Sequence, residues 1–315
     1  MFLCISVNPA IDKRVRLTKL LPGRVNRVTG VQAAAGGKAT HVAMVLRSLG
    51  AEPRWLGFVG GSSGQELLAG LRDLGIHADP VPMKNATRNN LEMIDDCGTV
   101  TEILEPGASV SIEEICAFES ACDAVFSGAH GGVTAILSGS LPPGAPKEFY
   151  ARLIERAHSF GARAFLDTSG EPLKLALEAA PDFVKPNREE AQWLTGKLIR
   201  DPDSAAAAIR QIIAAGPKSA AISLGQDGLV WKPPSDEKFY YAHPAKVAAC
   251  SAVGSGDAAL AGFAYAAEKK LGTEESLKLA AACGAANCLA GLPGQLSAAE
   301  VRRLRELVKV EVVVP

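Results

Sequence analysis

The sequence predicts an α/β fold, in which helices cover both faces of a mostly parallel central sheet and a small β-strand lid lies beside it. Apolar runs of strand length alternate with helical patterns through most of the chain, and the first strands are expected at 2–7, 55–59 and 133–137. Uninterrupted apolar strands, each followed by a helix, are typical of parallel sheets that are buried on both faces.

The helical segments follow the strands at regular intervals. Residues 39–49 and 147–160 have helical apolar spacing, and each is followed by a glycine, Gly50 or Gly161, of the kind that commonly ends a helix. The same reasoning predicts further strands at 163–167, 182–185 and 220–224, and further helices at 65–74, 188–194, 257–268, 274–289 and 298–307.

Two more polar segments, 13–29 and 83–106, interrupt this order. Apolar and polar side chains alternate in parts of them, which is the pattern of strands with one exposed face. We therefore expect a discontinuous β lid at 13–29 and 83–106. The main domain, which would bind nucleotide and substrate, is then built from 1–12, 30–82 and 107–315. Two long surface loops are the alternative, although loops of that length without structure of their own are uncommon.

Composition narrows the class of protein. Lys plus Arg is 33 and Asp plus Glu is 34, so the net charge of −1 gives no general attraction to nucleic acid or to a membrane. Seven cysteines, an odd count without a C-x-x-C pair, predict reduced thiols in a cytoplasmic protein. The N-terminal apolar run is too short for a signal peptide, and no stretch reaches the ~20 apolar residues of a membrane helix.

One glycine-rich turn indicates phosphate chemistry. Gly254, Ser255 and Gly256 directly precede a helical pattern, and glycines let consecutive backbone N–H groups turn toward one anion at the positive end of a helix. Asp257 follows at the edge of this turn, where its carboxylate could take a proton from an attacking hydroxyl. The alternative is that Asp257 only caps the helix.

Polar turns also follow several predicted strands, and ligands of parallel sheets lie beyond the carboxyl ends of strands. Asp12 is placed there to accept hydrogen bonds from sugar hydroxyls, although a plain turn residue is the alternative. Asn187 and Glu190 either lie near a hydrated Mg²⁺ or form a capping box. Ser138-Gly139-Ser140 also follows a strand, and Gly36-Gly37-Lys38 lies just before a helix, where a Gly-Gly turn lets a ligand approach the backbone closely; a plain turn is the alternative for each.

Taken together and in this order, these pieces resemble the ribokinase / phosphofructokinase-B family of carbohydrate kinases over nearly the whole chain. The resemblance implies a ribokinase-like three-layer α/β/α fold and an ATP-dependent transfer of phosphate to a sugar hydroxyl. The segments that carry it are NPAID (8–12), GGKATHVAMVL (36–46), TRNN (87–90), TEILEPG (101–107), LSGSLPPG (137–144), KPNREEAQWLTG (185–196), SLGQDG (223–228) and VGSGDAALAGF (253–263).

Three of the segments look closest to one branch of the family. NPAID, TRNN and the GRVNRV of 23–28 are most similar to the hexose-phosphate branch, which includes 1-phosphofructokinase and tagatose-6-phosphate kinase. The resemblance therefore implies a substrate of the fructose-1-phosphate, fructose-6-phosphate or tagatose-6-phosphate type.

The resemblance also implies a role for each matched residue. Asp257 corresponds to the family's general base, and Gly254, Ser255 and Gly256 correspond to its anion hole. The substrate-binding positions are Asp12, which holds sugar hydroxyls, Gly36, Gly37, Lys38 and His41 of the glycine loop, Ser138, Gly139 and Ser140, and, for the sugar's existing phosphate, Arg88 with the lid residues Arg24 and Arg27.

The cofactors that the resemblance implies are ATP and Mg²⁺, with K⁺ in some members. Glu190 and Asn187 correspond to the region of the Mg²⁺, which would be held through water. Backbone carbonyls of Ser251, Val253 and Gly291 lie where some members hold K⁺. The positions that correspond to the ATP site are Lys185, Asn187, Ser223, Gly225, Gly228 and, at the adenine, Asn287.

The glycine loop departs from the family pattern, which usually continues K-G-x-N. Here Lys38 is followed by Ala39, Thr40 and His41, so a larger side chain that can carry charge replaces the asparagine that touches the sugar. We consider a tolerated substitution, a changed sugar choice and an added phosphate contact.

Two other functions and one assembly are also considered. Some members of the fold phosphorylate unphosphorylated sugars or nucleosides, and a sensor could keep the pocket without catalysis. Exposed lid strands have free edges that invite pairing, so a homodimer formed through the lid is a further expectation.

Overall fold

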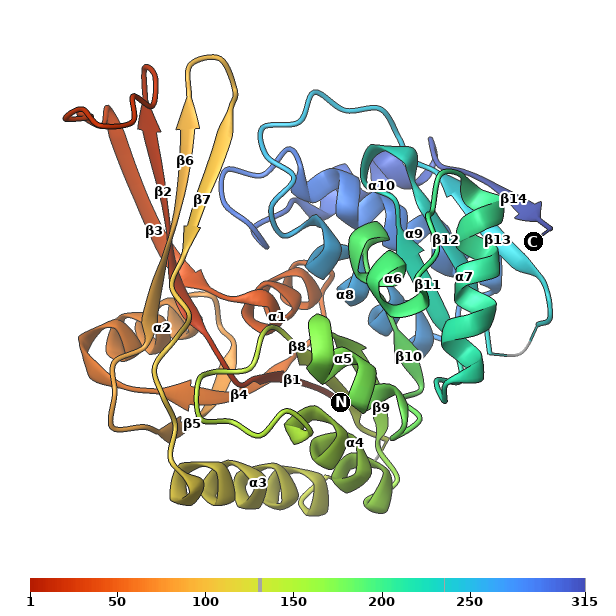
Figure 1. The fold of residues 1–315 in the computed structure, drawn as a ribbon, viewed down its shortest axis with the longest axis horizontal. Helices are drawn as coiled ribbons and strands as arrows, with labels where there is room; N and C mark the ends of the chain where they lie inside the picture. Colours follow the sequence, from red (N-terminus) through yellow and green to blue (C-terminus); the bar gives the residue numbers. More distant parts are fainter. Residues whose placement is uncertain (130–131, 235, 315) are drawn as a thin grey trace.

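The computed structural model describes residues 1–129, 132–234 and 236–314, which form two sheets and the helices around them (Figure 1). The larger sheet has ten strands, in the order β14-β13-β12-β11-β10-β9-β8-β1-β4-β5. The strands from β5 to β11 in this order run parallel, and β12, β13 and β14 are antiparallel. Their bounds are β1 (Phe2–Ser6), β4 (Arg54–Val59), β5 (His77–Pro82), β8 (Thr134–Ser138), β9 (Arg163–Asp167), β10 (Phe183–Val184), β11 (Ala220–Ser223), β12 (Leu229–Lys232), β13 (Phe239–His243) and β14 (Lys309–Val313).

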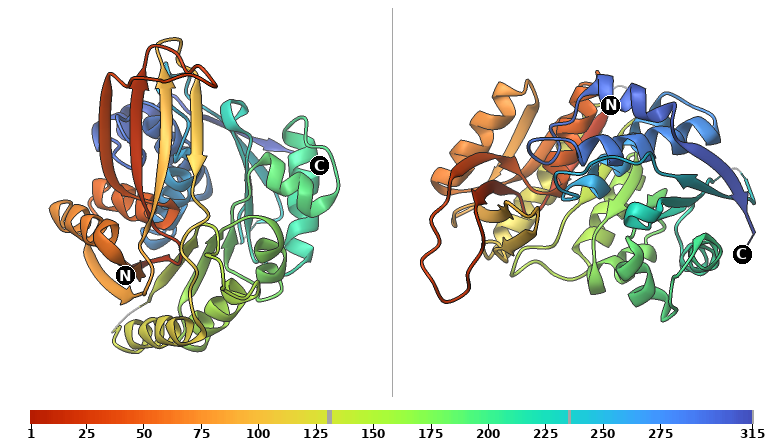
Figure 2. Two further views of the ribbon diagram at one scale, coloured as in Figure 1. Left: turned by 60° about the vertical axis from the view of Figure 1, so that its left-hand side comes forward. Right: turned by 90° about the horizontal axis from the view of Figure 1, so that it is seen from above.

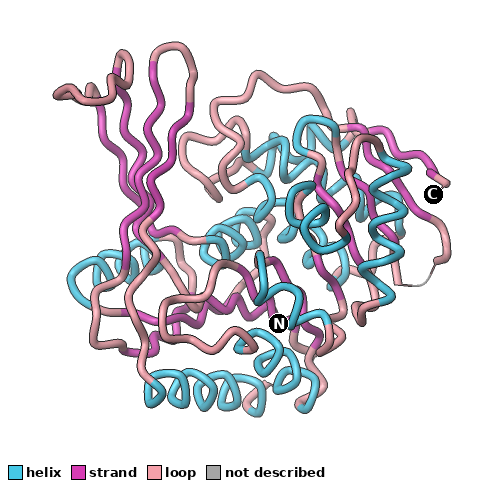
Figure 3. Tube along the Cα trace, in the orientation of Figure 1, coloured by secondary structure: helices cyan, strands magenta, loops and turns pink. Residues whose placement is uncertain are grey.

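Helices cover both faces of this sheet, as Figure 3 shows. Alternate residues of β1 explain why: Phe2 and Cys4 belong to one apolar cluster, whereas Leu3 and Ile5 belong to another on the opposite face. The first cluster includes side chains of α1 (Lys38–Ser48), α2 (Gly61–Asp73), α8 (Ser255–Glu268), α9 (Thr273–Asn287) and α10 (Ala298–Arg305); the second includes those of α3 (Ile112–Ser127), α4 (Phe149–Ser159), α5 (Gly170–Leu177), α6 (Arg188–Thr195) and α7 (Pro202–Ala214).

A second sheet projects from this body, as the two views of Figure 2 show. It has the order β3-β2-β6-β7. Its central strand β2 pairs antiparallel with β3 and parallel with β6, while β6 pairs antiparallel with β7. The bounds are β2 (Ala10–Leu17), β3 (Gly30–Gly36), β6 (Arg88–Asp95) and β7 (Val100–Leu104).

The strand bounds differ from the predicted lid segments. β2 begins at Ala10, and β3 lies outside 13–29, in a range that we assigned to the main domain. The sequence could not show this, because the small residues Ala33–Gly36 do not alternate with polar ones and β3 is fixed by its pairing with β2. The division into a main domain and a closing lid remains a prediction.

The predicted fold class is confirmed: every strand and helix expected from the sequence overlaps an observed element of the same type. The prediction missed α3, α5 and α7 and the strands β5, β12, β13 and β14. None of the helices in the described residues is long and apolar enough to cross a membrane.

Candidate active site

A cavity of about 440 Å³ lies where the two sheets and the N-termini of α1 and α8 meet. Neither helix has a side chain that caps its first N–H groups, so both present their positive ends to this region. Among its lining residues are Asp12, Arg14, Gly37, Lys38, His41, Arg88, Asn90, Glu92, Gly139, Ser140, Asn187, Glu190, Val253, Gly254 and Asp257.

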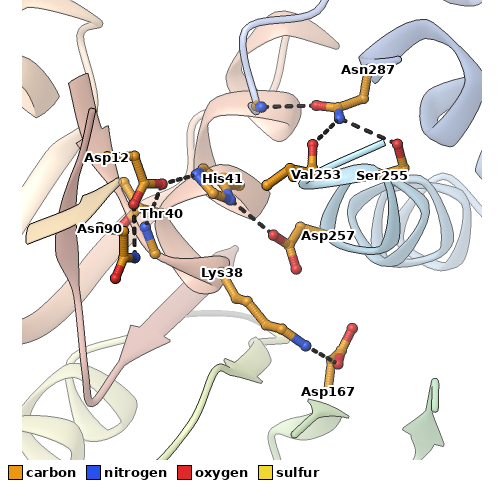
Figure 4. Close-up of polar contacts among 12 residues, drawn as sticks. Asp12, Lys38, Thr40, His41, Asn90, Asp167, Val253, Ser255, Asp257 and Asn287 are labelled. Carbon is orange, nitrogen blue, oxygen red and sulfur yellow. Dashed lines mark hydrogen bonds and ion pairs between the residues drawn. The ribbon is translucent and has the colours of Figure 1, made fainter. Parts of the chain in front are cut away.

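The structure joins the two carboxylates that the sequence singled out through one imidazole (Figure 4). His41 Nε2 lies 2.7 Å from Oδ2 of Asp12, and His41 Nδ1 lies 2.9 Å from Oδ2 of Asp257. The other oxygen of Asp12 accepts a hydrogen bond of 2.9 Å from Nδ2 of Asn90. Asp12 and Asp257 therefore lie on the same cavity, held at a fixed separation.

This arrangement favours the charged form of His41. Two carboxylates can both accept from one imidazole only if both ring nitrogens donate. Burial alone would lower the pKa of His41, but the hydrogen bonds and charges of Asp12 and Asp257 outweigh it and raise the pKa to about 10. Burial would raise the pKa of Asp12, yet His41, Asn90 and the Gly37 N–H hold it below its usual value.

Gly36 allows the close approach of Asp12. A Cβ atom at this position would lie 2.2 Å from Cγ of Asp12, so no larger residue fits while the carboxylate keeps its place. Asp12 also accepts a hydrogen bond of 3.3 Å from the Gly37 N–H. The predicted glycine loop thus positions the carboxylate that we expect to hold the sugar.

The predicted anion hole lies at the start of α8. Gly254 has φ +80°, which favours glycine, and a Cβ there would lie 2.9 Å from Cβ of Pro293. The Ser255 N–H already donates to the carbonyl of Ala252 at 3.1 Å, which leaves the next amides of the first turn, those of Gly256 and Asp257, as the ones without an intrahelical acceptor.

Two lysines converge on Asp167, which the sequence analysis missed. Lys38 Nζ lies 3.0 Å from Oδ1 of Asp167, and Lys185 Nζ lies 2.8 Å from its Oδ2. Burial would raise the pKa of Asp167, but the two ammonium groups lower it to about 2. A Cβ at Gly256 would lie 3.2 Å from Lys185 Nζ, so this ammonium stands beside the anion hole. The signal was available, because Asp167 ends a parallel strand.

Asn187 and Glu190 both line the cavity and also form a capping box at α6. The interpretation as a capping box is therefore confirmed, and it coexists with a site at the cavity wall. Burial and the negative charge of Asp167 raise the pKa of Glu190.

Within the described residues, no group of three or more His, Cys, Asp or Glu could hold a metal ion. One carboxylate and one amide fit a Mg²⁺ that keeps most of its waters and is shared with ATP phosphates.

The residues predicted for the nucleotide lie next to this wall. Ser223 forms a bridge with Asn187 between their backbones. Gly225 begins the short turn Gly225–Asp227, and Gly228 follows it. Arg188 at the start of α6 contacts this turn, because its Nη2 lies 2.7 Å from Oδ2 of Asp227. Their contacts with ATP remain predictions.

Arg88 lines the cavity from the first residue of β6. Its Nη1 donates to the Glu105 carbonyl at 2.7 Å, and its Nη2 donates to the Asn8 carbonyl at 3.0 Å. Its Nε is buried and has no hydrogen-bond partner among the described residues. Burial lowers the pKa of Arg88.

Not every predicted site residue reaches the cavity. Gly139 and Ser140 line it, whereas Ser138 is buried behind them in β8. Arg24 and Arg27 are exposed on the connection between β2 and β3 and do not line it. Asn287 is buried. Its Nδ2 donates a hydrogen bond of 2.7 Å to the Val253 carbonyl, and its Oδ1 accepts one of 2.8 Å from the Gly294 N–H, so Asn287 holds two loops together. Its contact with adenine remains a prediction.

Several known proteins are similar to this chain in sequence and in fold. The chain matches the pfkB family carbohydrate kinases over residues 3–297. It is 35% identical over 267 residues to a 1-phosphofructokinase of Xanthomonas campestris pv. campestris, covering 83% of this chain and 82% of that protein. Phosphofructokinase-2 of Escherichia coli, in complex with substrates and products, superposes with a TM-score of 0.89 at 26% identity over 98% of both chains. That enzyme has also been solved in complex with potassium and in a tetrameric inhibited form.

A further solved structure shows the fold alone. A Thermotoga maritima protein described as a possible 1-phosphofructokinase has a TM-score of 0.89 at 23% identity and covers 99% of both chains. The fold and the cavity, with a carboxylate at an uncapped helix end, are those of a small-molecule phosphotransferase with an alcohol acceptor. The chain belongs to the pfkB family of carbohydrate kinases, and it is an ATP-dependent sugar kinase.

Proposed function

We propose that this kinase transfers the γ-phosphoryl group of ATP to a hydroxyl of a hexose phosphate, and that fructose 1-phosphate is the substrate. The 35% identity with a 1-phosphofructokinase over most of both chains supports this choice. The observation that carries the proposal is the shared cavity, in which one imidazole joins Asp12 to Asp257 and Arg88 lines the wall.

Asp12 orients the acceptor. Its carboxylate is fixed by His41, Asn90 and the Gly37 N–H, and it retains lone-pair capacity for sugar hydroxyls. A hydroxyl held between Asp12 and Asp257 would be pre-positioned for attack, and positioning supplies much of the rate of phosphoryl transfer.

Asp257 is the proposed base. Its Oδ2 faces His41, while its Oδ1 accepts no hydrogen bond from the described residues, so Oδ1 is left for the proton of the sugar hydroxyl. The first-turn N–H groups of α8 and the ammonium of Lys185 supply positive charge where negative charge develops on the transferring phosphoryl group. Mg²⁺, when bound with ATP near Glu190 and Asn187, would neutralise phosphate charge.

Arg88 is the proposed receptor for the phosphate that the sugar already carries. Its two Nη groups are tied to backbone carbonyls, so the guanidinium is held in one orientation. Burial lowers the pKa of Arg88, and an anionic ligand beside the guanidinium would offset this cost of burying its charge. A nucleoside or a free sugar would bring no negative charge to this guanidinium.

The projecting sheet supports a proposal about assembly. Its face and tip carry exposed apolar side chains, which favour pairing of two copies through this sheet. These residues are Val25, Val28, Val31, Ile103 and Leu104. In such a dimer Arg24 and Arg27 could act in the site of the other copy. Analytical ultracentrifugation tests the assembly: a monomer at assay concentration would refute it.

An ATP-consumption assay tests the function. The purified protein with Mg²⁺ and ATP is offered fructose 1-phosphate, fructose 6-phosphate, tagatose 6-phosphate, free hexoses and nucleosides. We expect the highest kcat/KM with fructose 1-phosphate. Preference for a free sugar or a nucleoside would refute the hexose-phosphate assignment, and binding of a sugar phosphate without ATP consumption would indicate a sensor.

A further inference from the structure

A buried ion pair joins the projecting sheet to the main body at the cavity wall. Arg14 of β2 and Glu92 of β6 face each other across paired strands. Arg14 Nε donates to Oε2 of Glu92 at 2.7 Å, and its Nη2 donates to Oε1 at 3.0 Å, so the pair is bidentate. The Arg14 side chain is only 2% exposed. A fully buried charge pair in a strand expected to face solvent requires an explanation beyond surface electrostatics.

The remaining nitrogen of this guanidinium contacts carbonyls of a distant loop. Arg14 Nη1 donates to the Gly291 carbonyl and, at 3.4 Å, to the Ala290 carbonyl. The hydroxyl of Ser251 donates to Oε1 of Glu92 at 2.6 Å. The pair thus holds both the loop that leads into Gly254 and the loop that follows α9, and these two loops flank the anion hole.

These same loops are the ones for which the family resemblance implied a monovalent cation, but their contacts do not fit one. K⁺ is held by a shell of carbonyl oxygens that replace its hydration water. Here the Gly291 carbonyl accepts from Arg14 and the Val253 carbonyl accepts from Asn287 at 2.7 Å, so two of the three predicted carbonyls already have a donor.

Electrostatics leads to the same conclusion. An arginine side chain carries a positive charge on its guanidinium. A K⁺ ion at the Gly291 carbonyl would compete with Nη1 of Arg14 for this oxygen, and it would lie beside a guanidinium whose charge Glu92 alone balances.

We propose that the Arg14 guanidinium, anchored by Glu92, is a built-in replacement for the monovalent cation, and that the pair positions the two loops that flank the anion hole, Arg14 through Gly291 and Glu92 through Ser251. Arg14 is a positioning residue, because it acts on the phosphoryl site through the backbone of the loops. Since it belongs to β2, the projecting sheet itself delivers the charge. The kinase would therefore work without K⁺, unlike an enzyme whose loop needs a bound ion.

Two measurements on the unmodified protein test this inference, and the first of them needs no substrate. The thermal unfolding midpoint is measured with K⁺, Na⁺ or tetramethylammonium as the sole monovalent cation at equal ionic strength. We expect equal midpoints. A midpoint raised selectively by K⁺ would overturn the inference and leave the proposed function untouched.

The second measurement is kcat in the same three salts, and it rests on the proposed function for its substrate. We expect kcat to be independent of the cation. An activity that falls about tenfold or more in tetramethylammonium and returns with K⁺ would overturn the inference. Absence of activity in every salt would instead refute the proposed substrate, and the unfolding midpoints would then decide on Arg14 alone.

A variant pair isolates the role of Arg14. In R14Q with E92Q, both buried charges are removed together, so neither is left unpaired. We expect kcat to fall about tenfold or more with a smaller change in the KM for ATP, because the anion hole loses its support. R16A is the control, since Arg16 lies two residues away on the same strand and is exposed. A double variant with unchanged kcat would overturn the inference. A double variant that fails to fold leaves the decision to the cation dependence of the unmodified enzyme.

Discussion

Nδ1 of His41 lies 2.9 Å from Oδ2 of Asp257, so the proposed base on α8 is held by a residue of α1 that lies far from it in sequence. The same imidazole holds Asp12 on its other side. The distance between the sugar-holding carboxylate and the base is thus set by one rigid ring. The asparagine that the family pattern has at this position is shorter and uncharged.

Removing the charge of His41 should change how stability depends on pH. The stability that protonated His41 contributes is complete below its ordinary pKa of 6.5 and is lost as the pH rises through about 10, because its pKa is raised in the folded protein. In H41N two carboxylates share a neutral amide. We expect the free energy of unfolding of H41N to be lower than that of the unmodified protein by about 2 kcal/mol or more at pH 6.5, because charge-assisted hydrogen bonds are lost. This gap between the two proteins should narrow as the pH rises toward 10.

Urea unfolding of the two proteins at a series of pH values measures this gap. H77N is the control, because His77 is exposed and its nearest carboxylate oxygen, on Asp79, is 3.6 Å away. A gap of constant size between pH 6.5 and pH 10 for H41N would show that His41 is not the bridging cation.

Arg88 should determine affinity for the phosphorylated acceptor. Replacing it by alanine removes charge-assisted hydrogen bonds worth about 1.5–3 kcal/mol, which corresponds to a rise of about ten- to a hundredfold in the KM for fructose 1-phosphate. Steady-state kinetics of R88A checks this. The KM for ATP serves as the internal control and should change little. Equal KM values for fructose 1-phosphate in R88A and the unmodified enzyme would remove Arg88 from the phosphate site.

Gly36 should be sensitive to a single methyl group. In G36A the new Cβ would meet Asp12 Cγ at 2.2 Å, so the carboxylate must leave its hydrogen bonds with His41 and Asn90. We expect kcat/KM for the sugar to fall about a hundredfold. G30A is the matched control on the same strand, because nothing lies within 4 Å of its Cβ, and it should remain active. A fully active G36A would contradict the assigned role of Asp12.

Much of the fold was accessible from the sequence because parallel strands are uninterrupted apolar runs. β1, β8 and β9 carry this pattern, and glycines mark the ends of α1 and α4. The elements that were missed have weaker signals: β5 contains two prolines, and β12 to β14 are short strands at the antiparallel end of the sheet, whose pairing comes from tertiary contacts. For α3 the signal existed, since Ser111 and Glu114 form a capping box.

The site was predictable where residues follow strands or precede helices. Asp12, Gly36 and Asp257 were found in this way, and the structure brings them together. Arg14 and Glu92 could not be found, because charged residues in a polar strand segment are usually solvated and only the register between β2 and β6 makes them a pair. The bridge of His41 depends likewise on the packing of α1 against α8.

The most direct test of the account is the turnover of D257N. Asparagine keeps the shape and can still accept from His41 Nδ1, but it cannot take the proton of a sugar hydroxyl. We predict that kcat with fructose 1-phosphate falls by about two orders of magnitude or more while the affinity for ATP stays close to that of the unmodified enzyme. A kcat near that of the unmodified enzyme would contradict the assignment of Asp257 as the base.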